Sequence, residues 1–341
     1  MSRLDNPYTN RKAISYEGNF FGRQGELRAM YTRLLNGTSV SLIGERRTGK
    51  SSLMNALSFE SARESLEIQE NVRIAYADCQ EMAGCDEETF LGYLCQQFAT
   101  AMEMDEPVVP SRGAFKLLAR AAHMRGLRPV LAIDEFEVLI EDATMGPEFL
   151  AFLRSWTSGT ETPIVIASRE GTVEQLTEER STGSAFLNVF SPVYVGPLEP
   201  QDAMDLITVP AEIIGEPFDS EDIDWIRSVG GLLPFFLQIA SFHLLEGRRT
   251  FGEGEKARKA AERSFTYEAT PNMQYLARRL SPTERTALSH WVNDHEAMPR
   301  DGYEALIRKG ILIRDPDERV FSKTFIELFS RMHNDKGNYG H

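Results

Sequence analysis

The sequence contains little cysteine and no long apolar run. Its 341 residues include three cysteines, none of them in a C-x-x-C pair, so we expect neither a disulfide framework nor a zinc site. No run approaches the roughly 20 apolar residues that a membrane-spanning helix needs. The first residues also lack the apolar centre of a signal peptide. We therefore expect a cytoplasmic protein with reduced thiols and no membrane partner.

Basic residues are also outnumbered by acidic ones. The net charge is −14 at pH 7, which argues against a protein that coats nucleic acid over most of its surface. The negative charge lies before Pro271, because the residues from there onward contain 11 Lys and Arg against 10 Asp and Glu. At 341 residues the chain exceeds one ordinary domain, so we expect two or three.

One segment has a specific pattern of glycine, lysine and serine. Residues 44–51 fit the phosphate-binding loop pattern G-x-x-x-x-G-K-[ST], between an apolar run and a helical pattern. In such a loop, backbone N–H groups bind nucleotide phosphates, the lysine contacts the β- and γ-phosphates, and the serine binds Mg²⁺. The alternative is an accidental glycine-rich turn, which the strand–loop–helix setting disfavours. We predict that Lys50 has a catalytic role and that Ser51 is a metal ligand. The residues predicted to bind the nucleotide are Gly44, Glu45, Arg46, Arg47, Thr48, Gly49, Lys50, Ser51 and Ser52.

Two acidic residues end an apolar run further along the chain. Residues 129–133 are followed by Asp134 and Glu135. At the tip of a strand beside the loop, Asp134 can hold Mg²⁺, and Glu135 can orient or deprotonate an attacking water. The alternative is a solvated acidic turn after a buried strand. The next strand ends near Arg169, which is either a sensor of the γ-phosphate or an ordinary loop arginine.

Short β-branched runs alternate with helical patterns, which indicates an α/β fold with a parallel sheet and helices on both faces. We expect strands at 40–43, 72–77, 130–133, 164–167 and 193–195, and helices at 49–59, 87–102, 113–125 and 146–157. Periodic apolar residues then predict a small helical lid with helices at 203–214, 223–229, 235–245 and 255–267. A loop or hinge is expected at 246–254.

The last part of the sequence predicts a winged-helix-like domain. Helices are expected near 273–280, 282–292 and 302–309, followed by two strands within 310–322, and Ser281 with Glu284 predicts a capping box. The expected domains are a P-loop NTPase domain at 1–198, a helical lid at 199–270, a winged-helix-like domain at 271–331 and a flexible tail at 332–341.

Several segments outside these motifs resemble AAA-like and STAND NTPases, over roughly residues 6–245. The pattern Phe-x-Gly-Arg-x-x-Glu-Leu at 20–27 resembles the segment that opens these domains and packs near adenine, which implies base contacts from Phe21, Gly22 and Arg23. Residues 194–207 look like the junction between sheet and lid.

Two further segments carry the same resemblance. Residues 231–234 are similar to the lid segment whose proline approaches the base, although the family spacing Gly-x-Pro is here Gly-x-x-Pro, ending at Pro234. Residues 167–169 resemble a Thr-Thr-Arg sensor that ends at Arg169. The resemblance implies ATP or ADP with Mg²⁺ as ligands.

The sequence departs from the hexameric relatives in two ways. No arginine stands out as a finger that reaches a neighbouring subunit, although Arg46, Arg47, Arg154 and Arg180 are candidates, and no pore loop is evident. We therefore favour a nucleotide switch over a processive motor. Arg46 and Arg47 are expected to face outward, toward a partner or a neighbouring subunit.

Three functions remain open. The first is a slow ATPase switch that acts through a protein partner or a homo-oligomer. The second is a DNA-binding ATPase of the origin-recognition or transposition-regulator type, which would use Arg300, Arg308 and Lys309 of the winged helix. The third is a scaffold that binds nucleotide without hydrolysing it, against which the Asp134–Glu135 pair argues. No guanine-reading Asn-Lys-x-Asp motif is present, so we expect ATP and not GTP.

Overall fold

The computed structural model describes residues 6–68, 71–107, 109–141, 145–159, 161–172, 187–293, 299–314 and 318–337. The chain forms two compact units. Residues 13–44 and 50–195 make up the sheet unit, and residues 1–12, 45–49 and 196–341 make up the helical unit. The middle of the phosphate-binding loop therefore groups with the helical unit, although we predicted residues 1–198 as one domain.

The sheet unit is built on five strands that are all parallel to their neighbours. Their spatial order is β2 (Val72–Asp78), β3 (Arg128–Asp134), β4 (Ile164–Ser168), β1 (Ser39–Ile43) and β5 (Phe190–Tyr194). All five predicted strands are confirmed. The register pairs Asp78 with Asp134 and Ile43 with Ser168, so the carboxyl ends of four strands meet at one edge of the sheet. Pro192 lies on the edge strand β5, where a missing N–H is tolerated.

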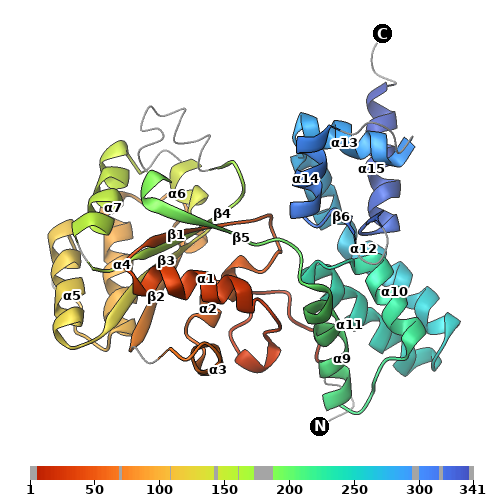
Figure 1. Cartoon of the computed structure of the whole chain (residues 1–341), viewed down its shortest axis with the longest axis horizontal. Coiled ribbons are helices and arrows are strands. Elements are labelled where there is room, and N and C mark those ends of the chain that lie inside the picture. Colours follow the sequence, from red (N-terminus) through yellow and green to blue (C-terminus); the bar gives the residue numbers. More distant parts are fainter. Residues whose placement is uncertain are drawn as a thin grey trace. The chain divides into compact units, whose positions relative to one another are not determined.

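Successive strand residues point to opposite faces of the sheet, and each face is buried. Leu131 and Ile133 pack in one hydrophobic cluster, and Val130 and Ala132 pack in the other. Helices therefore cover both faces, as predicted (Figure 1). They are η1 (Glu17–Asn19), α1 (Gln24–Leu35), α2 (Lys50–Ala56), α3 (Glu60–Ser65), η2 (Cys79–Met82), α4 (Glu87–Ala101), α5 (Arg112–Met124), α6 (Glu137–Glu141), α7 (Pro147–Gly159) and η3 (Leu187–Val189).

The helical unit contains the predicted lid and winged-helix elements. They are α9 (Pro200–Ile213), α10 (Ser220–Gly230), α11 (Pro234–Phe251), α12 (Glu255–Arg279), α13 (Pro282–Asn293), α14 (Arg300–Arg308), β6 (Leu312–Ile313), β7 (Arg319–Val320) and α15 (Lys323–Gly337). The strands β6 and β7 form an antiparallel hairpin after the helices. Within the described residues, no helix has the length and apolar character that crossing a membrane requires.

The predicted hinge at 246–254 is wrong for most of its length, because α11 continues to Phe251. We interpreted Gly247 as a sign of a loop. In the structure a Cβ at this position would come 2.7 Å from the backbone oxygen of Ala257, so glycine here permits close packing of α11 against α12. The chain turns only at Gly252, which has a φ of 79°.

Two other boundaries also differ from the prediction. Thr270 and Pro271, where we placed a domain boundary, lie inside α12, which runs on to Arg279. The predicted flexible tail begins within α15, which extends to Gly337. No proline or glycine interrupts the sequence between Lys323 and that glycine, so nothing in the chain ends the helix earlier.

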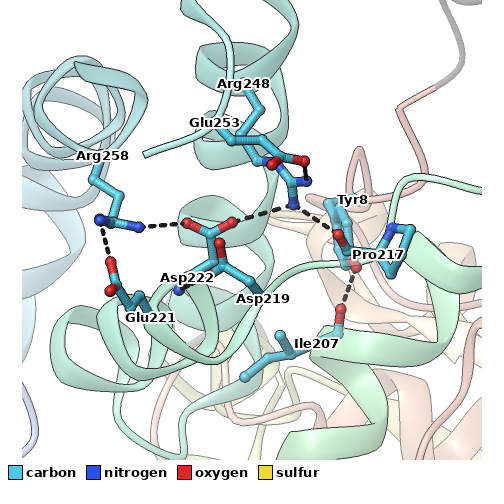
Figure 2. Close-up of polar contacts among 9 residues, drawn as sticks. All are labelled: Tyr8, Ile207, Pro217, Asp219, Glu221, Asp222, Arg248, Glu253 and Arg258. Atoms are coloured by element: carbon cyan, nitrogen blue, oxygen red, sulfur yellow. Dashed lines mark hydrogen bonds and ion pairs between the residues drawn. The ribbon is translucent and has the colours of Figure 1, made fainter. Parts of the chain in front are cut away.

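The first described residues are anchored on the lid helices. The Tyr8 hydroxyl donates a hydrogen bond to the backbone oxygen of Ile207 in α9 (Figure 2). Arg11 Nε lies 2.5 Å from Glu268 Oε1 in α12. These contacts explain why residues before 13 group with the helical unit.

A buried ionic network joins three helices of the lid (Figure 2). The Asp222 side chain of α10 is fully buried, and its two oxygens lie 3.1 Å from Arg248 Nη1 of α11 and 3.0 Å from Arg258 Nη1 of α12. Each arginine also pairs with an exposed carboxylate, Glu253 at 2.6 Å and Glu221 at 2.5 Å respectively. One aspartate therefore ties three helices together.

Substitution of Gly231, at the C-terminal end of α10, tests how closely the lid is packed. Its φ is 64°, and an added Cβ would come 2.7 Å from the Cβ of Phe321. We expect Gly231→Ala to cost about 1–2 kcal/mol for the left-handed backbone and about 1–3 kcal/mol more for overpacking. Gly252→Ala is the matched control, because its φ is 79° but no atom lies within 4 Å of the added Cβ. Thermal unfolding should show the larger loss for Gly231→Ala, and equal losses would contradict the packing argument.

Candidate nucleotide-binding site

The phosphate-binding motif forms the turn between β1 and α2, as predicted. The backbone N–H of Gly44 donates to the backbone oxygen of Ser168 in β4 at 3.3 Å, which fixes the start of the turn to the sheet. Lys50 is 7% exposed, and its Nζ donates to the Gly44 backbone oxygen at 2.9 Å. Gly49 has a φ of 99°, a conformation that favours glycine. The Lys50 side chain is thus hydrogen-bonded to the first residue of its own motif.

The two predicted metal ligands are joined through a tyrosine. Asp134 ends β3 and is 2% exposed. Its Oδ2 accepts a hydrogen bond from the Tyr76 hydroxyl of β2 at 2.7 Å, and its Oδ1 accepts one from the backbone N–H of Glu135 at 2.9 Å. The Ser51 hydroxyl lies close enough to the same Tyr76 hydroxyl to oppose the rise in the pKa of that phenol. The structure therefore brings Ser51 and Asp134 to one place.

This donor set fits Mg²⁺. A hydroxyl and a carboxylate are hard oxygen ligands, and Mg²⁺ in nucleotide sites takes one or two such ligands together with phosphate oxygens and water. Among the described residues, no group of three His, Cys, Asp or Glu side chains could hold a metal by itself. Ser51 and Asp134 would accordingly hold the ion jointly with a nucleotide.

Glu135 follows the strand in a strained backbone conformation. Its φ is 49°, which a residue with a side chain rarely adopts. The next N–H, that of Phe136, donates to the backbone oxygen of Ala167 at 3.0 Å and fixes the turn to β4. Burial, and then the charge of Glu137, raises the pKa of the Glu135 carboxyl. A carboxylate with a raised pKa is a stronger proton acceptor than one with an ordinary pKa.

A family model described as novel STAND NTPase 1 matches residues 13–240, which is more than half of the chain. The chain belongs to this family. The match confirms the resemblance inferred from the motifs. None of the curated proteins matches the sequence.

Solved structures show the same fold for this STAND NTPase. A Walker-type ATPase of Pyrococcus abyssi matches with a TM-score of 0.62 and 15% identity, over 95% of this chain and 99% of that one. The ORC2 protein of Aeropyrum pernix, in ADPNP and ADP complexes, matches with a TM-score of 0.63 and 14% identity, over 98% and 99%. The ORC1 protein of the same organism, in complex with DNA, matches with a TM-score of 0.50 and 14% identity, over 92% and 93%.

The predicted sensor arginine of this STAND NTPase is held by two acids of α6. Arg169 Nε lies 2.6 Å from Glu137 Oε1, and Arg169 Nη2 lies 2.8 Å from Glu141 Oε1. Glu137 is buried, so this pair is well shielded from solvent. Contact between Arg169 and a γ-phosphate stays a prediction.

The predicted adenine contacts lie on two segments. Gly22 and Arg23 both have left-handed φ angles, of 71° and 64°, and form the turn that begins α1. Arg23 is 5% exposed and pairs with Glu26 at 2.7 Å. Pro234 is the first residue of α11, where its missing N–H costs nothing. The roles of Phe21, Gly22, Arg23 and Pro234 in base binding, and that of Ser52, whose Oγ accepts the N–H of Ile14 at 3.0 Å, stay predictions.

The two arginines of the loop have partners within the chain. The Arg47 guanidinium lies 4.6 Å from the ring centre of Phe235 in α11, and that of Arg46 lies 5.7 Å from the ring centre of Tyr275 in α12. Both arginines are exposed, as expected, and aromatic side chains of the lid helices also contact them. Contact with a partner or a neighbouring subunit stays a prediction. Of the other finger candidates, Arg154 lies exposed on α7 and Arg180 lies outside the described residues.

Lys309, directly after α14, contacts the phosphate-binding loop of this STAND NTPase. Its Nζ lies 2.9 Å from Glu45 Oε1 of the loop and 2.9 Å from Glu284 Oε1 of α13, and its side chain is only 10% exposed. Burial opposes the lysine charge, but the two carboxylates outweigh burial and raise its pKa. Glu284 also forms the predicted capping box with Ser281, at 2.8 and 3.2 Å.

Sequence reasoning missed the roles of Tyr76 and Lys309. Tyr76 lies two residues before the end of β2, and a polar aromatic residue near the carboxyl end of a predicted strand is a usable signal for a site residue. Lys309 was interpreted as a candidate DNA contact. Its partner Glu45 is far away in sequence, and no local pattern joins them.

Proposed function

We propose that this STAND NTPase binds ATP with Mg²⁺, hydrolyses it slowly and acts as a molecular switch. Nucleotide state would change the arrangement of the lid and winged helix, and a protein partner or self-assembly into a homo-oligomer would receive the signal. The support is the phosphate-binding loop, the Ser51–Asp134 donor set and the half-buried Glu135, together with membership of an NTPase family.

Each side chain has a distinct role in the proposed reaction. Lys50 Nζ would exchange the Gly44 carbonyl for β- and γ-phosphate oxygens, which keeps the ammonium hydrogen-bonded throughout. Glu135 would accept a proton from the attacking water. A Mg²⁺ ion held by Ser51 and Asp134 would neutralise part of the phosphate charge. Arg169 would sense the γ-phosphate.

The ion pair between Lys309 and Glu45 carries the proposal of a switch. Glu45 is the second residue of the loop, and Lys309 belongs to the winged-helix part of the chain. Phosphates bound by the loop bring negative charge close to this buried pair, where screening is weak. Nucleotide binding therefore changes the free energy of the pair and biases the position of α14, which is what a ligand-driven switch requires.

We expect Lys309→Met to uncouple the winged helix from the nucleotide. In the wild type, limited proteolysis and light scattering after size exclusion should differ between ADP and a non-hydrolysable ATP analogue, and in Lys309→Met this difference should be lost. The control is Lys259→Met, which removes an exposed lysine paired with Glu255 at 2.6 Å. Because the exposed pair contributes little, the control should behave as wild type. The same behaviour of the wild type in both nucleotides would rule out the switch.

DNA binding is the weaker candidate. We expected it to use three basic residues of α14 and the turn after it, and Lys309 among them is buried against two carboxylates. A lysine in that environment cannot release counterions from DNA phosphates without breaking both pairs. Steeply salt-dependent duplex binding in a filter assay would make DNA binding the stronger candidate and the switch the weaker one.

A further inference from the structure

Tyr76 lies between the two side chains that we propose to hold Mg²⁺. Its hydroxyl donates to Asp134 Oδ2 at 2.7 Å and lies near the Ser51 side chain. Tyr76 belongs to β2, Asp134 to β3 and Ser51 to α2, so the phenol connects three elements of the sheet unit. All three residues lie within this one unit.

The direction of these hydrogen bonds follows from the donors available. A phenol has one hydrogen, and in this structure it goes to the Asp134 carboxylate, which can only accept. The Tyr76 oxygen is then left with lone pairs, to which the nearby Ser51 hydroxyl can only donate. The phenol hydrogen is therefore committed to Asp134, and the phenol oxygen is open to a hydrogen from Ser51.

This direction leaves both ligands ready for a cation. A Ser51 hydroxyl that turns its hydrogen toward the Tyr76 oxygen presents only lone pairs elsewhere, as a metal ligand must. Asp134 has one oxygen fixed by the Tyr76 hydroxyl and the other by the Glu135 N–H, so its carboxylate plane cannot rotate freely. Outer-shell partners of this kind orient metal ligands and tune their affinity.

We infer that Tyr76 is a positioning residue for Mg²⁺, one that orders Ser51 and Asp134 before the metal–nucleotide complex arrives. The inference rests on the proposed binding of a Mg²⁺–nucleotide at this loop. Its consequence is specific: Tyr76 acts on the metal-dependent part of nucleotide affinity and leaves the metal-free part alone, because the phosphates contact the loop and not the phenol.

The test is the Mg²⁺ dependence of ADP binding to the full chain. A fluorescent ADP analogue is titrated first with EDTA and then across a Mg²⁺ series. For Tyr76→Phe we expect metal-free affinity close to that of the wild type, and a half-saturating Mg²⁺ concentration raised about tenfold or more. An unchanged Mg²⁺ midpoint would overturn the inference. Equal losses with and without Mg²⁺ would also overturn it, because they indicate a general structural defect.

The matched control is Tyr93→Phe. Tyr93 also has a hydroxyl near the end of β2, where it accepts the N–H of Asp78 at 3.1 Å and donates to Glu81 at 3.2 Å. It contacts neither proposed metal ligand in the described hydrogen bonds, so its Mg²⁺ midpoint should equal that of the wild type. A shift as large as that of Tyr76→Phe would contradict the assigned role.

Two further measurements sharpen the test, and the first of them does not require Tyr76→Phe to fold. Tyr76→His restores an N–H donor and should recover part of the Mg²⁺ dependence. In an Asp134→Asn background, Tyr76→Phe should add no further shift, because the side chain that Tyr76 orients is already changed. Additive shifts would overturn the inference. A wild type that binds no ADP under any condition would reject the proposed function itself, whereas Mg²⁺-dependent binding that Tyr76→Phe does not alter rejects only the role of Tyr76.

Discussion

Glu135→Gln is expected to reduce ATP hydrolysis by about 10²- to 10⁴-fold while ATP stays bound. Glutamine keeps the size of the side chain but cannot take a proton from water at neutral pH. The residue also keeps its place, because the backbone turn is fixed by the bond from the Phe136 N–H to β4. Lys50 and the loop are untouched, so nucleotide affinity should change little.

The measurement is a single-turnover assay with labelled ATP, followed by analysis of the nucleotide that remains on the protein. We expect wild type to retain ADP and Glu135→Gln to retain ATP. Glu148→Gln, an exposed acid in the first turn of α7, is the control and should turn over as wild type. If wild type and Glu135→Gln hold the same nucleotide and show the same turnover, the chain is a nucleotide-binding scaffold and not an ATPase.

The parts of the site that were predictable are those that a short stretch of sequence specifies. The loop at 44–51 is one continuous motif, and an apolar run that ends in two acids places Asp134 at a strand tip without knowledge of the rest. Both are confirmed in position, at the ends of β1 and β3. Burial of both faces of the sheet likewise follows from the β-branched composition of the strands.

The contacts that were not predictable join residues far apart in the chain. Tyr76 and Asp134 are 58 residues apart, and they meet because β2 lies beside β3 in the sheet. The strand order differs from the order in the chain, since β1 lies between β4 and β5. No local pattern specifies that order. Lys309 is a second case, since a basic residue at a helix end is equally consistent with DNA contact and with an ion pair inside the chain.

Gly247 shows the same limit within the lid. Glycine in a charged stretch is a local signal for a loop, but packing against α12 decides the outcome. The neighbouring arginines also fell within the predicted loop or hinge at 246–254. One of them, Arg248, instead reaches the buried Asp222 of α10 from inside a continuous helix.

Asp222→Ala should destabilise the helical unit by about 3–5 kcal/mol, the usual effect of removing one member of a buried ion pair. The substitution leaves Arg248 and Arg258, which are 11% and 18% exposed, without their shared counter-ion. Both guanidinium groups would then lack their buried counter-ion while still largely shielded from water, although Arg248 keeps its hydrogen bond to the backbone oxygen of Pro217. The helices α10, α11 and α12 would also lose a side chain that links all three.

The same arginines supply the controls. Glu253 and Glu221 pair with Arg248 and Arg258 from the outside and are each 74% exposed. Exposed pairs contribute about 1 kcal/mol or less, so Glu253→Ala and Glu221→Ala should shift the unfolding midpoint only slightly. Calorimetry on the full chain is the suitable measurement, because two units can unfold in separate transitions.

Burial is the property that separates these outcomes. All three substitutions remove one carboxylate from an arginine, but only Asp222 was taken out of water on folding, and burial raises its pKa even with two arginines beside it. The cost of Asp222→Ala therefore comes from arginines left charged in a shielded place, not from the loss of attraction alone. A loss no greater than that of Glu221→Ala would mean that water reaches the arginines once the aspartate is gone, and the lid would then be held by its apolar contacts.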